Sequence, residues 1–440
     1  MSLEGTWEMS VNLTSEIFSL SKCPGNHLDR KNSYTMALAF FGLKVIDFTQ
    51  VLAGPHASQL LAMLGADVIK IESPDRGDQL RQMLTADETE PYGMSPAFMT
   101  TNVGKRSLAL DLKHPKSREI IHRLLDGADV MMENFKAGAI ERLGYGYEDV
   151  RKINPSIVYC SVTGYGQRGP MRGAGAYDGA IQAASGMMSM NGHETTGPTR
   201  TGFQSVDVPT AITTAFAIAS ALYRKLATGM GQYLDVSMLD TAMSMMQCQY
   251  AQYLVSGKVA GLDGNNSPLG LPTQNVYPTA DGYIQITALT EKDAQRTLRA
   301  IGCQAVLDDP ATADNEGRRR LHDAVWQEMA DALRSDSTAK WCEKLGAEAI
   351  PVAEIRDIPA VLADPQLQHR NIIHTVGVPG GGSDQHRLVG AAFLADQDGP
   401  ATDRPAPILG EHNAEILREL GYAAAEINAM DRDGVFGASQ

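Results

Sequence analysis

The segment LKVIDFTQVLAGPHASQLLAMLGADVIKIE, residues 43–72, has the pattern of a strand, a helix and a second strand. Its ends, residues 43–48 and 67–72, are short runs rich in β-branched residues, which favour strands. The stretch 56–64 between them favours a helix that ends at Gly65. Because such units place their two strands in the same direction in one sheet, the segment predicts an α/β fold with a parallel sheet.

The same alternation of strands and helices continues along the chain. The further predicted strands are 107–112, 130–133, 157–163 and 232–236, and the further predicted helices are 115–125, 208–226 and 239–254. Residues 185–202 are rich in Gly, Met, Thr and Ser, so we expect an irregular loop there rather than strands. The whole pattern predicts a doubly wound, Rossmann-like parallel sheet with helices on both faces.

A change of composition after Ser256 predicts a second, smaller α+β domain. Gly, Asn and Pro cluster between residues 261 and 278, and the predicted strand DGYIQITAL, residues 281–289, follows them. At 440 residues the chain exceeds what one core usually organises. The expected division is a mobile polar leader at 1–40, a large α/β domain at 41–255 that 400–440 completes, a linker at 256–278, a small α+β domain at 279–375 and a return linker at 376–399.

Composition and charge exclude several classes of function. Lys and Arg total 38 against 52 Asp and Glu, and the net charge of −14 argues against partners such as nucleic acid or an anionic membrane. No apolar run is long enough to cross a bilayer. The five cysteines are scattered without a CxxC pair, and the histidines show no metal-binding spacing. We therefore expect no metal and a cytoplasmic location.

The loop after the first strand is a candidate ligand site. Gln50, Val51, Leu52 and Ala53 follow the carboxyl end of that strand and precede a helix, which is where doubly wound sheets bind their ligands. The free amides at the start of the helix favour an anionic group. The loop is not a GxGxxG turn, so a dinucleotide is not expected there.

Cations follow successive predicted strands and suggest a phosphorylated ligand. Arg76 and Arg81 follow the second strand, Lys105 and Arg106 precede the third, Lys113 follows it, and Arg142 follows the fourth. Collected at one edge of the sheet in an acidic protein, such residues would favour phosphate groups. Taken singly, each one has the ordinary alternative of a solvated surface charge.

Asp207 is the acid with the most suggestive position. It follows the Gly-rich stretch and precedes the long apolar helix, with Pro209 at a first-turn position. An aspartate there is ordinarily an N-cap, which accepts hydrogen bonds from free helix amides. Its position alone leaves the choice between a cap and a nucleophile open.

An ordered series of motifs resembles the family III CoA transferases, the group that includes formyl-CoA transferase and carnitine CoA-transferase. The motifs are LKVIDFTQVLAGP, LGADVIKIE, NVGKRSLALDLK, MMENFKAGAIERLG, CSVTGYGQRGP, AYDGAIQAASG, QSVDVP, GQYLDVSMLD and ILGEH. They extend over residues 43–422 in the same order as in the family. Any one motif is weak, whereas the ordered set is specific.

The resemblance implies a reaction and a site. Asp207 aligns with the catalytic aspartate, whose carboxylate attacks the donor thioester and then carries CoA as an aspartyl thioester to a free carboxylic acid. No cofactor beyond CoA itself is implied. The implied CoA-pocket residues are Leu110, Lys113, Asn134, Phe135 and Arg142, with Tyr177 near the acyl group. The family also forms interlocked homodimers, so we expect an interlocked homodimer here.

Two departures from the family bear on the substrate. Formyl-CoA transferase has a glutamine where this chain has Leu52, and four successive glycines where this chain has GNNSPLGLP, residues 264–272. We therefore expect another acid than formate, such as the dicarboxylate succinate.

Three other functions are compatible with the fold. An α-methylacyl-CoA racemase shares it, but resembles AGHD where this chain has Tyr177 in GAYD, and tyrosine is a weak base at neutral pH. A CoA-binding protein without turnover would have no use for Asp207. An NAD-dependent enzyme would need the GxGxxG turn that is absent from the sequence.

Overall fold

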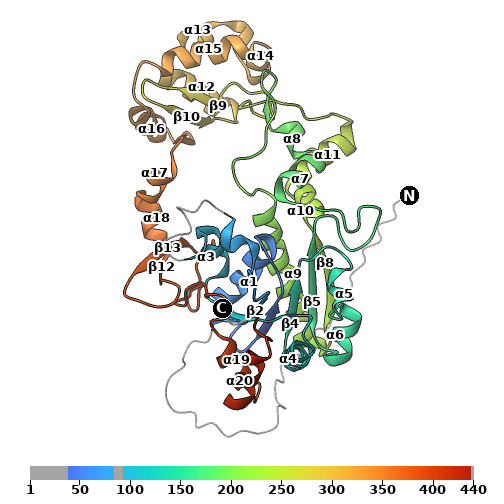
Figure 1. Ribbon diagram of the computed structural model, residues 1–440. Helices are drawn as coiled ribbons and strands as arrows, with labels where there is room; N and C mark the ends of the chain where they lie inside the picture. Colours follow the sequence, from blue (N-terminus) through green and yellow to red (C-terminus); the bar gives the residue numbers. More distant parts are fainter. Residues whose placement is uncertain (1–37, 84–92, 438–440) are drawn as a thin grey trace, which may run out of the picture. The chain divides into compact units, whose positions relative to one another are not determined.

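A six-stranded sheet with every strand parallel to its neighbours is the largest sheet of the computed structural model, which describes residues 38–83 and 93–437 (Figure 1). Its strands, in spatial order, are β3 (Arg106–Ala109), β2 (Asp67–Glu72), β1 (Lys44–Asp47), β4 (Val130–Glu133), β5 (Val158–Thr163) and β8 (Gln232–Ser237). The strand order reverses between β1 and β4, which is the point where doubly wound sheets open a crevice. The predicted α/β fold is confirmed.

Helices cover both faces of this sheet, because successive strand residues point to opposite sides. Val45 packs in one core with side chains of α1 (Ala53–Met63) and α9 (Asp207–Thr228). The next residue, Ile46, packs in the core on the other face. The helices that contribute to that second core are α4 (Pro115–Asp126), α5 (Ala139–Arg142), α6 (Tyr147–Ile153), α19 (Asn413–Glu419) and α20 (Ala424–Arg432).

Helix α9 is the longest helix of the described chain, and only one of its faces is covered. It ends at Gly229, which has φ 70, a conformation that glycine adopts without steric cost. Ala211 and Ile218 are fully buried against α1 and the sheet. Phe216 and Leu226 are exposed at 73% and 86%. The nearly uncharged sequence of α9 therefore leaves an apolar face open in the single chain.

A three-stranded antiparallel sheet forms a separate core later in the chain. Its strands, in spatial order, are β11 (Val352–Glu354), β10 (Tyr283–Thr287) and β9 (Gln274–Pro278). The helices and short 3₁₀ turn of this part are α12 (Glu291–Ile301), α13 (Gln304–Asp308), η2 (Pro310–Thr312), α14 (Asn315–Arg320), α15 (His322–Leu333) and α16 (Thr338–Ala347). Tyr277, Ile286 and Leu298 are fully buried in its core. These elements have the α+β character expected of the second region.

Short elements complete the described chain. They are η1 (Gln79–Gln82), α3 (Pro96–Asn102), α7 (Asp178–Ala184), α17 (Ile358–Leu362), α18 (Pro365–Arg370) and the antiparallel pair β12 (Ile373–Gly377) and β13 (Gln385–Val389). The predicted leader lies outside the described residues except for positions 38–40. Within the described ranges, no helix combines the length and apolar character that a membrane span requires.

Two local predictions are wrong. Residues 185–202 are not an irregular loop: they contain the short helix α8 (Met187–Met190) and an antiparallel hairpin of β6 (Gly192–His193) and β7 (Gly197–Pro198). Gly197, at φ 81, permits the tight turn of this hairpin. The predicted helix 239–254 is two helices, α10 (Met238–Met245) and α11 (Gln247–Ser256), because the backbone at Met246 leaves helical geometry.

Candidate active site

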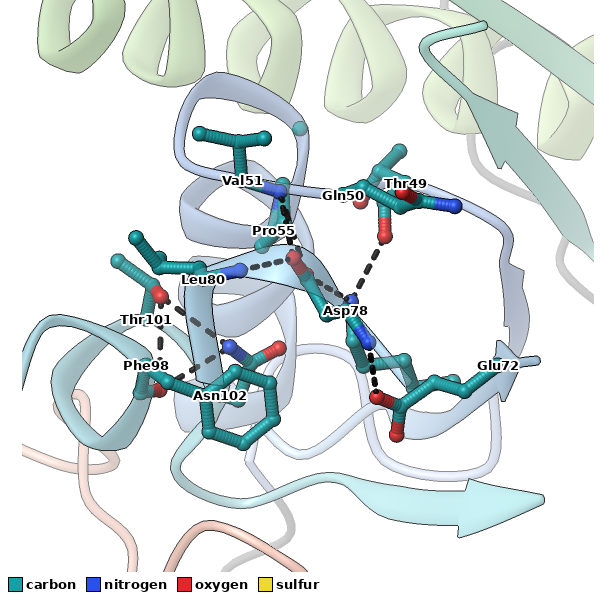
Figure 2. A network of polar contacts seen from close by, with 12 residues as sticks. Thr49, Gln50, Val51, Pro55, Glu72, Asp78, Leu80, Phe98, Thr101 and Asn102 are labelled. Atoms are coloured by element: carbon teal, nitrogen blue, oxygen red, sulfur yellow. Dashed lines mark hydrogen bonds and ion pairs between the residues drawn. The ribbon is translucent and has the colours of Figure 1, made fainter. Parts of the chain in front are cut away.

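The loop between β1 and α1 contains a strained residue. Val51 has φ 65, in the left-handed region that β-branched residues avoid at a cost of about 1–3 kcal/mol. Its amide donates to the Asp78 carboxylate at 2.9 Å, which also accepts from the Leu80 amide at 2.9 Å (Figure 2). A buried carboxylate from the segment after β2 thus holds the Val51 conformation.

Asp78 belongs to a chain of buried charges beside this loop (Figure 2). Lys70 pairs with Asp78 at 2.9 Å and donates to the Thr49 carbonyl at 2.7 Å. Glu72 accepts from the Asp78 amide at 2.9 Å and pairs with Arg81 at 2.8 Å. Because buried charges are stable only when they are paired, these contacts fix the carboxyl end of β2 relative to the loop.

The carboxyl end of β1 is held by a second buried pair. Asp47 and Lys105 are fully buried, and their charged atoms are 3.1 Å apart. Burial opposes ionisation of Asp47, but Lys105 and Lys70 outweigh it and lower the pKa of this carboxyl. Burial lowers the pKa of Lys105 to about 8. Lys105 is therefore part of the buried framework, and the interpretation of this residue as a phosphate-binding surface cation is wrong.

Asn134, at the end of β4, clamps the same loop from the other side of the crevice. Its side-chain oxygen accepts from the Gln50 amide at 2.8 Å, and its side-chain nitrogen donates to the Gln50 carbonyl at 2.7 Å. The neighbouring Glu133 is buried and accepts from the Phe135 amide at 2.9 Å. Burial raises the pKa of Glu133 to about 7. These hydrogen bonds orient Asn134 and Phe135, the two residues that follow β4.

A cavity of about 350 Å³ opens at this crevice and contains Asp207. Its lining includes the following residues predicted for the site: Gln50, Val51, Leu52, Ala53, Asn134, Phe135, Tyr177 and Asp207. Four glycines, Gly164, Gly166, Gly173 and Gly175, also line it. Glycines let a ligand approach the backbone closely, because no side chain intervenes. No histidine is among the described residues that line the cavity.

Asp207 begins helix α9 but does not cap it. The cap is Asp178: its carboxylate accepts from the amides of Val206 at 2.8 Å and Asp207 at 3.0 Å. Gln182 in turn donates to the other Asp178 oxygen at 2.5 Å. Among the described residues, the Asp207 carboxylate has no hydrogen-bond or ion-pair partner. The alternative that Asp207 is an N-cap is therefore wrong, and its carboxylate is available to a ligand.

The environment of Asp207 makes its carboxyl group more basic than an ordinary aspartate. Burial raises its pKa, and the negative charge of Asp178 adds to the effect, to a value of about 7. No cation offsets these two influences. A carboxyl group of higher pKa is a stronger nucleophile once it is ionised, so the site favours covalent chemistry at this oxygen.

The described residues contain no group of three or more His, Cys, Asp or Glu side chains placed to hold a metal ion. The cavity contains a carboxyl group of raised pKa, the start of helix α1 and glycines that allow close backbone approach.

The family model of CoA-transferase family III matches residues 40–413 of the chain. The chain belongs to this family. It is 35% identical over 390 residues to a succinate–glutarate CoA-transferase of Agrobacterium fabrum, covering 86% of this chain and 95% of that protein. It is 31% identical over 379 residues to a human succinyl-CoA:glutarate CoA-transferase, covering 86% of this chain and 85% of the relative. A crystal structure of a CaiB/BaiF family protein from Brucella suis superposes with a TM-score of 0.78 at 30% identity, covering 87% of this chain and all of the other. The chain is therefore a CoA-transferase.

Four predicted CoA-binding residues of this CoA-transferase lie outside the lining of the cavity that contains Asp207. Arg76, Lys113 and Arg142 are exposed. Leu110 is fully buried in the core beneath the sheet, so only its backbone could approach a ligand. Their contact with CoA stays a prediction.

Sequence reasoning missed the residues that hold the site in place. Asp178 begins helix α7 in the motif AYDG. Asp178 also caps α9, which the local sequence does not indicate, because the amides of Val206 and Asp207 that it binds are 28 and 29 residues away. The short spacing between β2 and Asp78 was a usable signal, because a carboxylate that closely follows a strand lies at the same sheet edge as the site.

Proposed function

We propose that this CoA-transferase moves CoA from an acyl-CoA to a free carboxylic acid through a covalent aspartyl-CoA thioester at Asp207. The observation that carries this proposal is the availability of the Asp207 carboxylate. It lies in the cavity, free of helix capping, because Asp178 caps the helix in its place. The relatives' names refer to succinate and glutarate, which agrees with carboxylic acids as substrates.

The reaction begins with attack of an Asp207 oxygen on the thioester carbonyl of the donor. The carbon–sulfur bond breaks, CoA leaves as a thiolate, and a mixed anhydride joins Asp207 to the acyl group. The thiolate then attacks the Asp207 carbonyl carbon of the anhydride and releases the donor acid as a carboxylate. The product of this half-reaction is an aspartyl-CoA thioester, and no net proton transfer is required.

The second half-reaction reverses these steps with another acid. Its carboxylate attacks the Asp207 thioester carbon and displaces CoA thiolate, which gives a second mixed anhydride. The thiolate attacks the acyl carbon of this anhydride, and the new acyl-CoA forms as the Asp207 carboxylate is regenerated. Because both acids use the same carboxylate in turn, the kinetics should be ping-pong.

The chain's own residues supply orientation and charge stabilisation for these steps. Leu52 and Ala53 stand at the start of α1 and line the cavity, and in this proposal their amides stabilise the oxyanion. Asp178 orients the Asp207 backbone. Asn134 fixes the Gln50 backbone next to these amides. Positioning of this kind is the main source of rate when the nucleophile is weak.

A racemase would require a base to remove a proton from the α-carbon of the acyl group. The absence of histidine from the cavity lining disfavours this reaction. A protein that only binds CoA would gain nothing from a carboxyl group of raised pKa that does not cap its helix.

Trapping with hydroxylamine tests the proposal. After incubation with an acyl-CoA and hydroxylamine, mass spectrometry of the digested protein should locate a hydroxamate at Asp207. The variant Asp207→Ala should lose the label and the transfer activity. Asp240→Ala, which removes an exposed acid from the first turn of α10, should keep both. An unlabelled wild-type protein that still transfers CoA would contradict the covalent route.

The proposal includes a homodimer in the cytoplasm. The exposed apolar face of α9, with Phe216 and Leu226, is a surface that a second copy would cover. The described cysteines are free, as is usual in a reducing compartment. Analytical ultracentrifugation should show a dimer, and Phe216→Glu should shift it toward monomer.

A further inference from the structure

Asp207 also lines a second cavity, separate from the one described above. It has a volume of about 350 Å³ and shares Val51, Leu52, Tyr177 and Asp207 with the first cavity. Its other lining residues include Arg200 and the apolar side chains of Leu80, Met83, Ala97 and Phe203. The two cavities therefore adjoin at Asp207 and differ in the chemistry of their other lining residues.

Arg200 is the single cation among the described residues that line this second cavity. Among the described residues it has no ion-pair or hydrogen-bond partner, although the chain as a whole is acidic. No ion pair within the described part of the chain joins it to the neighbouring Asp178, whose carboxylate accepts from the Val206 and Asp207 amides and from Gln182. An unpaired guanidinium beside an apolar lining suits a ligand that has both an anionic end and an aliphatic part.

The backbone on both sides of Arg200 is fixed by hydrogen bonds. Thr199 donates its amide to the Asn191 carbonyl at 2.6 Å, and its own carbonyl accepts from the Asn191 side chain at 2.8 Å. Thr201 donates its amide to the buried Gln182 side chain at 3.0 Å. Gln182 also contacts Asp178, so one side chain connects the Arg200 segment to the cap of α9. These bonds hold the backbone of the Arg200 segment next to the start of α9.

Gly179 leaves space for the Arg200 side chain. A methyl group at this glycine would lie 3.4 Å from Cδ of Arg200 and 3.9 Å from its Nη1. The stem of the arginine therefore lies along the first turn of α7, directly after the capping residue Asp178. The Arg200 side chain is exposed, and this contact places its stem beside the second cavity, which it lines.

We propose that Arg200 binds the second carboxylate of an aliphatic dicarboxylic acid whose first carboxylate exchanges CoA at Asp207. The inference rests on the proposed function, because it needs an acid that reacts at Asp207. The guanidinium would hold the distal carboxylate by two parallel hydrogen bonds, and the apolar residues would contact the methylene groups between the two carboxylates. Arg200 is in this role a specificity-determining residue.

The test compares a dicarboxylic acid with the monocarboxylic acid of equal chain length. Initial rates with one acyl-CoA donor are measured for succinate against butyrate and for glutarate against valerate. The wild type should prefer the dicarboxylic acid in kcat/KM, and Arg200→Met should reduce that preference by about 30-fold, the effect expected for a charged hydrogen bond. Arg200→Lys keeps the charge without the bidentate geometry, so its preference should be intermediate.

Arg320→Met is the matched control, since it removes an exposed arginine from α14 and should leave the preference unchanged. A wild type without preference for dicarboxylic acids would overturn the inference. An equal fall in kcat/KM for the dicarboxylic and the monocarboxylic acid in both Arg200→Met and Arg200→Lys would also overturn it. Such a fall would indicate a general defect in CoA binding or folding.

Hydroxylamine trapping at Asp207, carried out on the same samples, distinguishes failure of the inference from failure of the proposed function. If Asp207 is labelled and the preference does not depend on Arg200, only the role of Arg200 is refuted. If active wild-type protein is not labelled at Asp207, the proposed covalent route fails first.

Discussion

The Asp178 carboxylate accepts a 3.0 Å hydrogen bond from the backbone amide of Asp207. Asp178 thus caps helix α9, a role that the sequence position of Asp207 would suggest for Asp207 itself. The arrangement has two physical effects: it orients the start of α9, and it places a second negative charge near the Asp207 side chain. Both effects can be separated by substitution.

Two substitutions of Asp178 should therefore separate its effect on the stability of the fold from its effect on the pH dependence of the transfer rate. Asp178→Ala removes the cap, which should cost about 1 kcal/mol in the free energy of unfolding. Asp178→Asn keeps an acceptor oxygen for the amides and should recover most of this loss. Both variants remove the charge, so both should shift the acidic limb of the transfer rate to lower pH. Chemical denaturation and pH–rate profiles measure the two effects, and an unchanged limb would show that Asp178 acts only structurally.

The ionisation of Asp207 should control the first half-reaction. Only the carboxylate is nucleophilic, and its pKa is about 7 because of burial and of the Asp178 charge. The value of kcat/KM for the acyl-CoA should therefore rise about tenfold per pH unit below this pKa and level off above it. Stopped-flow measurement of donor-acid release between about pH 5 and pH 9 gives this profile. A limb centred near pH 4 would contradict the raised pKa.

The same ionisation should destabilise the folded protein at high pH. The folded pKa of Asp207 is raised above the ordinary 3.8. Between pH 4 and 7 the unfolded chain loses a proton that the folded chain keeps, so stability falls across this window. Asp207→Asn should therefore be more stable than wild type at about pH 8, by roughly 1–3 kcal/mol since water can reach the cavity, and nearly equal to it at about pH 4. Urea denaturation at both pH values checks the sign.

The clamp between Asn134 and Gln50 should be needed for catalysis and for stability. Asn134→Leu keeps the approximate volume but leaves the Gln50 amide and carbonyl without their partner, which should cost about 1–3 kcal/mol. Because the loop also carries Leu52 and Ala53, we expect a fall in kcat rather than only a rise in KM. Asn154→Leu provides a comparison: it removes buried hydrogen bonds to Leu125 and Ala128 outside the cavity lining, so it should lower stability without a specific loss of kcat.

Breaking the buried ion pair of Lys70 and Asp78 should lower the free energy of unfolding more than breaking an exposed ion pair. Asp78→Ala would leave Lys70 without its ion-pair partner in the interior, at a cost of about 3–5 kcal/mol. The double variant with Lys70→Met should be less destabilised than the sum of the single variants. Removing the exposed Asp331 from its 2.7 Å pair with Arg334 should change stability by less than about 1 kcal/mol. Equal costs for the buried and exposed pairs would refute the role of the buried charges.

Much of the fold could be predicted because its signals are local. The strands β2 and β4 have the bounds expected from their β-branched and apolar runs, and α9 begins one residue before its predicted start. Local signals failed at Met246, where one apolar run contains two helices. They failed also at 185–202, where a stretch rich in Gly, Met, Thr and Ser was expected to form a loop but forms a short helix and a hairpin.

The site could be predicted only in part, because its framework depends on contacts between distant segments. Asp207 was identified through the ordered motifs, whereas its position alone would have made it a cap. Lys105 looks like a surface cation in sequence, yet it is fully buried because Asp47, 58 residues away, provides its counter-charge. Nothing in the local sequence around either residue indicates this pairing.

The presence of Val51 and Leu52 in the linings of both cavities has a consequence for the order of events. Asp207 also lines both cavities, so the two cavities meet at this residue. Under the proposed mechanism, the released acid would leave through one cavity and the next acid would enter there, while the CoA part of the intermediate occupied the other. The covalently bound CoA would then stay in place throughout the exchange of the two acids.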